Sequence, residues 1–234
     1  MKQVLLLALT AVAVSQLGVA ASCSSGSLAT YLALGSSGCT IGGNTLSNFT
    51  ILTGLSGGTP IAPSSVTLNP MGSTFAPGLT ISTSQSASAG VPLEAIFTYD
   101  ISGPLYNSIS AMLSGSSETV DGAVTGIVNF CEGGMFGPDG VSGCASANGS
   151  LLTLDGTQNM DSATFSKIAT LAVTDDLTFD PGLSGTATGG TFTNSFTAVP
   201  EPLTSALAVF GFALVGALRV RSLRTQSTSE ITTN

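Results

Sequence analysis

Apolar and polar residues alternate along most of this chain. The alternation begins near Leu46, and its clearest stretch places apolar side chains at every second position from Leu93 to Ile101. Successive side chains of a β-strand point to opposite faces, so a period of two predicts strands with one buried and one wet face. Val120–Phe130 and Phe165–Val173 alternate in the same way, with Lys167 the one exception. The shorter predicted strands are Val66–Leu68, Leu79–Ile81, Leu105–Leu113, Leu151–Leu154, Leu177–Phe179 and Phe192–Phe196.

Turn-forming residues separate the alternating stretches, because glycine and proline interrupt strands more strongly than other residues do. They occur at Gly57-Gly58, Pro60, Pro77-Gly78, Gly103-Pro104, Asp155-Gly156, Pro181-Gly182 and Gly189-Gly190. About ten short strands separated by such signals are typical of an antiparallel β-sandwich or jelly roll. Since no linker divides residues 46–198, we expect a mainly β fold in which residues 22–198 form one β-sandwich domain.

One short helix is predicted before the strands, over residues 27–35. Ser27 can cap its first turn and Gly35 can end it. Leu28, Tyr31 and Leu32 share one helical face, because Tyr31 and Leu32 follow Leu28 by three and by four residues. The domain is therefore expected to begin with a short N-terminal helix.

The composition excludes several classes of function. The chain contains no histidine, which excludes Ser-His-Asp and Cys-His catalysis, His-ligated zinc and the HExxH metalloprotease pattern. Between Ser22 and Val199 the only basic residue is Lys167, against eight Asp and three Glu. Binding of a polyanion requires clustered Lys and Arg, so nucleic acid is not expected as a partner.

The N-terminus has the pattern of a secretory signal. Lys2 is followed by an apolar run from Val4 to Val14, and small residues stand at Val19-Ala20-Ala21. The run is too short to span a bilayer, so we interpret residues 1–21 as a signal helix that signal peptidase removes. The mature chain is then expected to start near Ser22 in an oxidising compartment.

Four cysteines follow the signal, which is an even number and suits disulfide bonding after export. Three pairings are open, and the spacing favours the local one, Cys23–Cys39 and Cys131–Cys144, each worth about 2–4 kcal/mol. Lipidation of Cys23 is an alternative, although the preceding residues lack the usual leucine of a lipobox. No CxxC spacing is present, so no metal site is expected at these cysteines.

A second apolar segment lies near the C-terminus. Residues 202–218 carry no charge and as a helix would reach about 25 Å, against a hydrocarbon core of about 30 Å. Arg219, Arg221 and Arg224 follow at one end. By the positive-inside rule this end faces the cytoplasm, so a transmembrane helix is predicted. A buried core helix is the alternative that a run of this length also permits.

The order of features at this end resembles the PEP-CTERM sorting signal of bacterial exported proteins. The matching features are Pro200-Glu201-Pro202, the apolar helix and the basic end, within residues 199–224. The resemblance implies recognition by an exosortase, a membrane-embedded cysteine-type transpeptidase, with cleavage near the motif. The chain departs from the family in its interrupted arginines and in the polar tail of residues 225–234. The segment from Leu28 to Phe49 also resembles the N-terminus of one group of PEP-CTERM cargo proteins, without implying an activity.

The acidic residues are candidates for catalysis or for cation binding. A glycosidase needs two opposed carboxylates, but none of the acidic residues lies in a recognisable motif. Oxygen ligands for a structural calcium ion are offered by Asp155, Asp161, Asp175, Asp176 and Asp180. Asp175, Asp176 and Asp180 surround a short predicted strand, where we interpret them as solvated turn residues.

Two further segments are candidates for recognition. Residues 131–144 are rich in glycine and predict a long disulfide-clipped loop that exposes Met135 and Phe136, either as a recognition tip or as a simple connection. In the last predicted strand, Thr191, Thr193, Ser195 and Thr197 alternate with Phe192 and Phe196. This alternation places hydroxyl groups on one face, which is either an adhesive or ice-facing array or an ordinary wet face.

These observations predict an exported protein without enzymatic activity. We expect it to be held transiently in the membrane by its C-terminal helix, processed by exosortase and delivered to the cell surface or extracellular matrix as a structural or adhesive component. A carbohydrate- or calcium-binding module on the same fold is the alternative, with extracellular polysaccharide as the candidate ligand. A carboxylate-dependent glycoside hydrolase is a third reading. No cofactor is expected.

Overall fold

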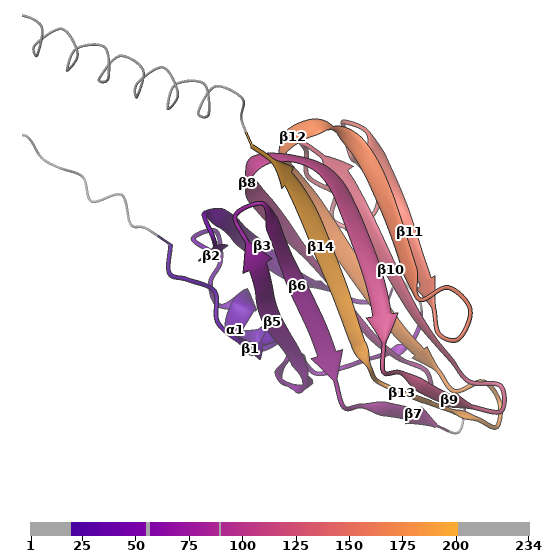
Figure 1. Ribbon diagram of the computed structural model, residues 1–234. Coiled ribbons are helices and arrows are strands. Elements are labelled where there is room, and N and C mark those ends of the chain that lie inside the picture. The colour runs from indigo at the N-terminus through magenta and orange to yellow at the C-terminus, as the bar shows by residue number, and fades with distance from the viewer. Residues whose placement is uncertain (1–19, 55–56, 89, 201–234) are drawn as a thin grey trace, which may run out of the picture.

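The computed structural model describes residues 20–54, 57–88 and 90–200, which form antiparallel sheets with one short α-helix (Figure 1). The predicted signal helix, apart from residues 20 and 21, lies outside the described residues. So do the sorting signal from Glu201 onward, the arginines and the polar tail. Within the described ranges, no helix is long and apolar enough to cross a membrane.

The elements follow one another along the chain as short and long strands, and two of them, β8 and β12, have more than twenty residues each. In order they are β1 (Gly26–Ser27), α1 (Leu28–Leu32), β2 (Cys39–Ile41), β3 (Asn44–Leu52), β4 (Thr59–Pro60), the 3-10 helix η1 (Pro63–Ser65), β5 (Val66–Ser73), β6 (Ala76–Thr83), β7 (Ser86–Ser88), β8 (Leu93–Ser114), β9 (Ser117–Thr119), β10 (Ala123–Glu132), β11 (Asn148–Leu154), β12 (Met160–Asp180), β13 (Thr186–Thr188) and β14 (Thr191–Val199).

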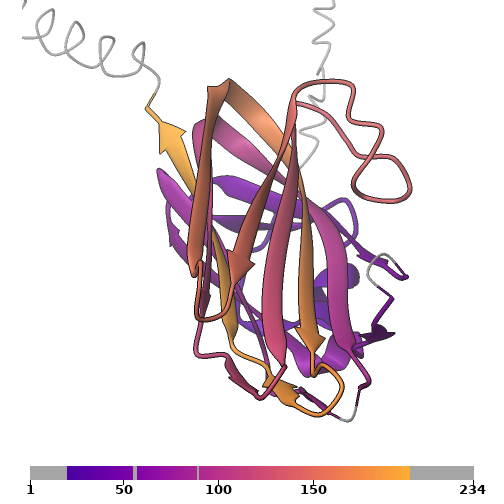
Figure 2. The same cartoon turned by 90° about the vertical axis from the view of Figure 1, so that its right-hand side faces the viewer.

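The main sheet is folded into two facing layers because β8 and β12 run through both of them (Figure 2). The first half of β8 pairs with β3 and its second half with β14, and the change falls at Gly103-Pro104. β12 pairs with both halves of β8, and its register shifts between Thr164 and Thr170. Bends and bulges of this kind let a strand turn the corner from one layer to the other.

We call the two parts layer 1 and layer 2. Layer 1 contains β2, β3, the first half of β8, the second half of β12, β10 and β11, whereas layer 2 contains β1, β5, β6, β14, the second half of β8 and the first half of β12. Gly126 of β10 lies so close to Phe192 of β14 that a Cβ atom there would be 2.4 Å from the ring. The two layers therefore pack face to face, as in a β-sandwich.

The alternation predicted for the first half of β8 is confirmed. Ala95, Phe97, Tyr99 and Ile101 are all buried between the layers. Phe49 of β3 stacks on both aromatic rings, with centroids 6.5 Å from Phe97 and 5.3 Å from Tyr99. Burial of such rings contributes about 1.5–3 kcal/mol each, so this cluster is a main source of stability for layer 1.

Three details of the predicted strands are wrong. Val120 lies in the turn between β9 and β10 and is 87% exposed, so it does not belong to the alternation that continues into β10. Ala169 is exposed, because the register shift in β12 breaks the period before Leu171. The two strands predicted on either side of Gly103-Pro104 are one continuous strand, β8. The two strands predicted on either side of residues 175–176 are likewise one strand, β12.

The N-terminal helix is confirmed as α1, although it is shorter than predicted. The Ser27 hydroxyl oxygen accepts a hydrogen bond from the Thr30 N–H at 3.3 Å, which caps the first turn. Tyr31 is buried, and its ring meets Phe49 edge to face at 5.1 Å. A disulfide between Cys23 and Cys39 ties the segment before the helix to β2, as the spacing predicted.

A small separate sheet in the order β7-β13-β9 closes the end of the molecule that lies far from residues 20 and 200 (Figure 1). β13 pairs with both neighbours, and Ala187 in its centre is buried. The loops beside this sheet therefore form the distal end of the described chain.

Candidate ligand-binding groove

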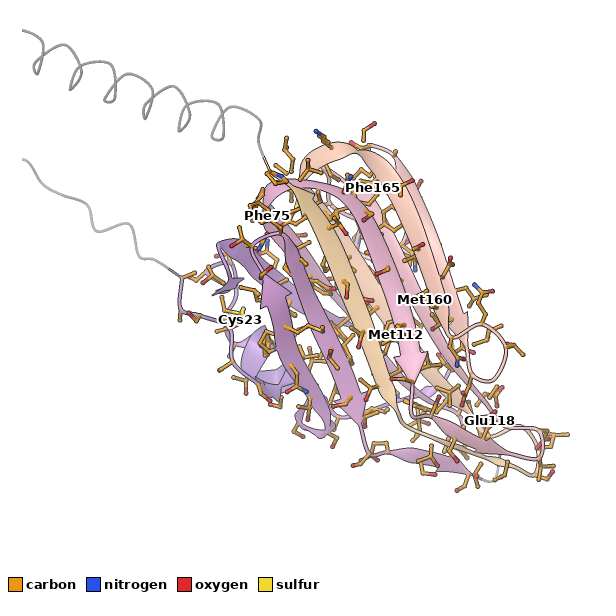
Figure 3. The ribbon with its side chains drawn as sticks, viewed as in Figure 1. Cys23, Phe75, Met112, Glu118, Met160 and Phe165 are labelled. Atoms are coloured by element: carbon orange, nitrogen blue, oxygen red, sulfur yellow. A yellow bond between two sulfur atoms is a disulfide. The ribbon has the colours of Figure 1, made fainter. Side chains whose placement is uncertain are left out.

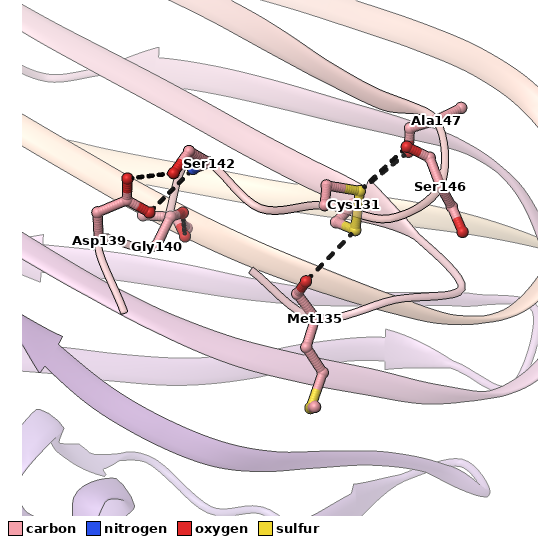
Figure 4. The surroundings of a disulfide bond; sticks show 9 residues. Cys131, Met135, Asp139, Gly140, Ser142, Ser146 and Ala147 are labelled. Carbon is pink, nitrogen blue, oxygen red and sulfur yellow. Dashed lines mark hydrogen bonds between the residues drawn. A yellow bond between two sulfur atoms is a disulfide. The ribbon is translucent and has the colours of Figure 1, made fainter. Parts of the chain in front are cut away.

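A disulfide between Cys131 and Cys144 clips the loop that follows β10, as predicted (Figure 4). The loop folds back over the outer face of layer 1. Its Gly140 has a φ of +69°, and an added Cβ would lie 2.2 Å from the Leu52 side chain. The Thr174 hydroxyl of β12 donates to the Gly140 carbonyl. Only glycine fits at this point of contact, which holds the loop against the sheet.

The loop is also closed on itself by a carboxylate. Asp139 Oδ1 accepts hydrogen bonds from the Val141 N–H at 3.2 Å and from the Ser142 N–H at 2.9 Å, and Oδ2 accepts one from the Ser142 hydroxyl (Figure 4). These hydrogen bonds, led by the one from the Ser142 side chain, lower the pKa of Asp139. The loop tip is thus ordered by its own polar groups as well as by the disulfide.

Between this loop and the sheet lies a groove of about 360 Å³. Its floor consists of outward-facing residues from three neighbouring strands of layer 1, namely Asn48 and Thr50 of β3, Thr98 and Asp100 of β8, and Ala172 of β12. On β3 and β8 these positions alternate with those of the buried rings of Phe49, Phe97 and Tyr99. The period of two therefore places polar atoms along the floor.

Asp100 is the only ionisable residue among those that line the groove. Its Oδ2 accepts a hydrogen bond of 2.7 Å from Asn48 Nδ2. Partial burial raises the pKa of Asp100, and the hydrogen bond from Asn48 opposes that rise. Asn48 itself has a φ of +58° at a register shift of β3, so the bulge turns its side chain towards the carboxylate.

The wall of the groove is apolar and comes from the clipped loop. Met135, Phe136 and Pro138 line it, and Met135 is 72% exposed. The predicted exposure of Met135 is thereby confirmed, whereas Phe136 is partly buried and lines the groove. The Met135 carbonyl oxygen lies 3.9 Å from the Cys131 sulfur, so the wall begins directly beside the disulfide.

The groove combines a neutral apolar wall with a floor of hydroxyl, amide and carboxylate groups. An anionic ligand would meet Asp100 without any basic lining residue to balance its charge. A calcium ion takes six to eight oxygen ligands and usually several carboxylates, whereas the lining offers one. Hydroxyl groups of a neutral ligand can donate to Asp100 and accept from Asn48, while an apolar ring face packs on Phe136.

The structure does not bring the acidic residues proposed for calcium together. Among residues 20–54, 57–88 and 90–200, no group of three or more acidic, histidine or cysteine residues is placed to hold a metal ion. Asp155 lies in the turn after β11, as predicted. The interpretation of Asp175 and Asp176 as turn residues is wrong, because both lie inside β12, which ends only at Asp180.

Asp175 is completely buried between the layers. Its Oδ1 accepts a hydrogen bond of 2.6 Å from Asn194 Nδ2 of β14, and the same amide lies 3.1 Å from the Tyr99 hydroxyl oxygen. Asp175 Oδ2 and Asn194 Oδ1 have no partner. Burial raises the pKa of Asp175 to about 7. The sequence contains a signal for this position, since Leu171, Val173, Asp175, Leu177 and Phe179 continue one period of two.

Two other pairs of acidic residues lie outside the groove. Glu94 is buried and accepts hydrogen bonds from the N–H groups of Gly54 and Gly58, and its charge adds to the burial that raises the pKa of Asp176. The Glu118 and Asp155 side chains form a hydrogen bond with each other, which raises the pKa of Glu118. The Glu118 and Asp155 side chains are in direct contact, so they do not face one another across a cleft as a glycosidase pair must.

The hydroxyl array predicted on the last strand extends over its neighbours in layer 2. Thr193 of β14 stands opposite Thr80 of β6 and Met112 of β8, and the two threonine hydroxyls lie 3.2 Å apart. Met112 in turn pairs with Met160, and both methionines are exposed (Figure 3). Beside this array, an open hollow of about 570 Å³ is lined by hydroxyl residues that include Thr67, Ser82 and Thr191, and no ionisable residue lines it.

No protein-family model, no curated protein and no solved structure matches this chain. The fold and the groove therefore define the class of the molecule by themselves, as a two-layered antiparallel β protein with a disulfide-clipped loop. Among the predicted sorting residues, Pro200 alone lies within the part of the chain that the structure describes. Glu201, Pro202, Arg219, Arg221 and Arg224 lie outside the described residues.

Proposed function

We propose that this chain is an exported, non-catalytic adhesive protein that holds a neutral, hydroxyl-rich polymer such as a polysaccharide in the groove beneath its clipped loop. The observation that carries the proposal is the juxtaposition of Phe136 and Met135 with the Asn48–Asp100 pair. Sugars present both hydroxyl groups and apolar ring faces. Few other common extracellular ligands match a site with one carboxylate, one amide and an apolar wall.

The shape of the groove supports an adhesive rather than a catalytic role. With a single lining carboxylate, it lacks the pair of acidic residues that hydrolysis of a glycosidic bond requires. Its wall and floor are joined by the disulfide and by the contact at Gly140, so the site is largely formed before a ligand arrives. Preorganisation reduces the entropy that binding costs.

The proposed location follows from the terminal segments. Residues 1–21 direct export, and the Pro200-Glu201-Pro202 motif with its apolar helix and arginines holds the protein in the membrane until exosortase processes it. The mature protein then stays at the cell surface or in the extracellular matrix. Two disulfides and an acidic surface suit that environment.

Isothermal titration calorimetry with neutral oligosaccharides tests the binding function. We expect the full-length protein, in a neutral detergent, to bind at least one among cello-, laminari-, malto- and chito-oligosaccharides, and not the anionic polymer alginate. Asp100→Asn removes the charged acceptor and Phe136→Ala removes the apolar wall. Asp100→Asn is expected to weaken binding about tenfold or more, because a hydrogen bond to a charged group is worth about 1.5–3 kcal/mol. Phe136→Ala is expected to weaken binding by a similar factor, because the ligand loses its apolar contact.

Phe75→Ala is the matched control, since Phe75 is 48% exposed in the turn between β5 and β6, away from the groove. This variant should bind as the unchanged protein does. Absence of heat with every neutral oligosaccharide, or equal affinity of Phe136→Ala and Phe75→Ala, would contradict the proposed function.

A further inference from the structure

The distal end of the molecule exposes apolar side chains in neighbouring loops. Val120 is 87% exposed and Leu183 is 92% exposed. Val91, which is 51% exposed, follows Gly90, and a Cβ at Gly90 would lie 3.7 Å from the Gly182 carbonyl oxygen. We call Val91, Val120 and Leu183 the apolar tip. It lies beside the small sheet of β7, β13 and β9, at the opposite end from residues 20 and 200 (Figure 1).

Asp121 fixes the positions of two of these side chains. Its Oδ2 accepts a hydrogen bond of 2.8 Å from the Leu183 N–H, and its Oδ1 accepts two of 3.3 Å from the N–H and hydroxyl of Ser184. These bonds, led by the one from Leu183, lower the pKa of Asp121. Gly182 packs so tightly that an added Cβ would lie 2.4 Å from the carboxyl carbon. Hydrogen bonds and close packing therefore hold the loops of Val120 and Leu183 against each other.

The backbone at Val120 is strained. The turn that contains it is closed by a hydrogen bond of 3.0 Å from the Gly122 N–H to the Thr119 carbonyl, and Val120 has a φ of +60°. A β-branched residue strongly disfavours this conformation, which glycine or asparagine adopts readily. An exposed valine stabilises nothing by burial in return. Strain kept without a gain in folding is typical of a functional position.

Acidic residues surround the apolar tip. Asp121 lies in the loop before β10 and Asp180 at the end of β12, and the hydrogen-bonded pair of Glu118 and Asp155 lies beside them. The only basic side chain in the described residues is Lys167, close in sequence to Phe165, and Figure 3 shows Phe165 and Glu118 at opposite ends. Like charges repel, so neither the same tip of a second copy nor an anionic lipid surface fits.

We propose that the apolar tip docks into another protein, in an apolar pocket whose rim carries lysine or arginine side chains. Branched aliphatic side chains on a rigid support lose little entropy when they enter such a pocket, and the acidic residues around them supply complementary charge and exclude water at the rim. This contact lies far from the groove and is independent of polymer binding.

Site-specific photo-crosslinking in the native host tests the proposal. A diazirine amino acid replaces Leu183 in the full-length protein, and Met71, an exposed apolar residue of layer 2, serves as the control position. We expect position 183 to crosslink one protein that position 71 does not. The purified partner should bind the unchanged protein directly and more weakly as the salt concentration rises, because salt screens the charged rim.

Val120→Gly separates function from folding. Glycine relieves the strain, so the midpoint temperature of unfolding should rise while partner binding falls. A crosslink to a second copy, to lipid or to no protein beyond the control would overturn the proposal. So would a partner bound independently of salt, or a Val120→Gly variant that keeps full affinity. Phe136→Ala leaves the tip intact, so loss of sugar binding alone bears only on the groove.

Discussion

Asp175 should make this protein more stable in acid than at neutral pH. The carboxyl is completely buried, with one oxygen bonded to Asn194 and the other unpartnered. Its pKa rises from 3.8 to about 7, mainly because burial disfavours the charged form and secondarily because of the nearby Asp176 charge, while the hydrogen bond from Asn194 opposes the rise. The folded protein is therefore less stable when this carboxyl is ionised than when it is protonated.

The sign follows from proton binding. Between about pH 4 and about pH 7 the folded carboxyl keeps its proton while the unfolded one has lost it, so the free energy of unfolding falls by about 1.4 kcal/mol for each pH unit. The contribution is fully present below about pH 4, and about 4 kcal/mol is lost once the pH exceeds the folded pKa. Asp100 and Asp176, whose pKa values are also raised, act in the same direction.

Asp175→Asn removes the largest part of this dependence. The amide keeps an oxygen for Asn194 but leaves an N–H without a partner, which costs about 1–3 kcal/mol at every pH. At about pH 8 the variant should therefore be more stable than the unchanged protein by about 1–3 kcal/mol, and at about pH 4 it should be less stable by a similar amount.

Urea unfolding of the full-length protein with intact disulfides measures the effect. Because the chain has no tryptophan, far-UV circular dichroism is the appropriate signal. Asp180→Asn, at the exposed end of the same strand, is the control and should keep the slope of the unchanged protein. The reasoning fails if the unchanged protein shows no loss of stability from about pH 4 to about pH 7, or if Asp175→Asn retains the same slope.

Three further predictions concern the clip, the core and the sorting signal. Replacing Cys131 and Cys144 together by alanine should lower the free energy of unfolding by about 2–4 kcal/mol and weaken oligosaccharide binding, as urea unfolding and calorimetry would show; unchanged affinity would mean that the loop needs no clip. Gly126→Ala should destabilise by about 1–3 kcal/mol, because the new methyl group meets Phe192, whereas Gly133→Ala, with no atom within 4 Å but a φ of +65°, tests the cost of backbone strain alone. Pro200→Ala combined with Pro202→Ala should leave unprocessed precursor in the membrane of the native host; mass spectrometry of secreted material with an intact C-terminus would count against exosortase processing.

The strands could be predicted from the sequence because their period is local, but their pairing could not. Ala95, Phe97, Tyr99 and Ile101 are buried as expected, although Ile96 on the opposite face is buried as well. The same pattern cannot show that the strands on both sides of Gly103-Pro104 are one, since that depends on their common pairing with β12 about sixty residues later. Asp175 was misread because a carboxylate is rare in a core, although its position in the period was visible.

The groove was partly predictable for a similar reason. The spacing of Cys131 and Cys144 predicts a clipped loop, and the loop exposes Met135 as expected. The contacts of Gly140 with Thr174 and Leu52 determine the position of the loop on the sheet, and these two residues come from other parts of the chain. The pairing of Asn48 with Asp100 likewise requires the bulge in β3.

The two strands that pass between the layers have a mechanical consequence. In a sandwich made of separate sheets, the layers are held to each other only by side chains and can slide or part when these loosen. Here the backbones of β8 and β12, and the hydrogen bonds between these two strands, continue from one layer into the other. A pulling force applied at residue 200 is transmitted through β14 to β8, and β8 distributes it to both layers. The domain should therefore resist force as a whole and yield in a single event, which would suit the proposed adhesive role.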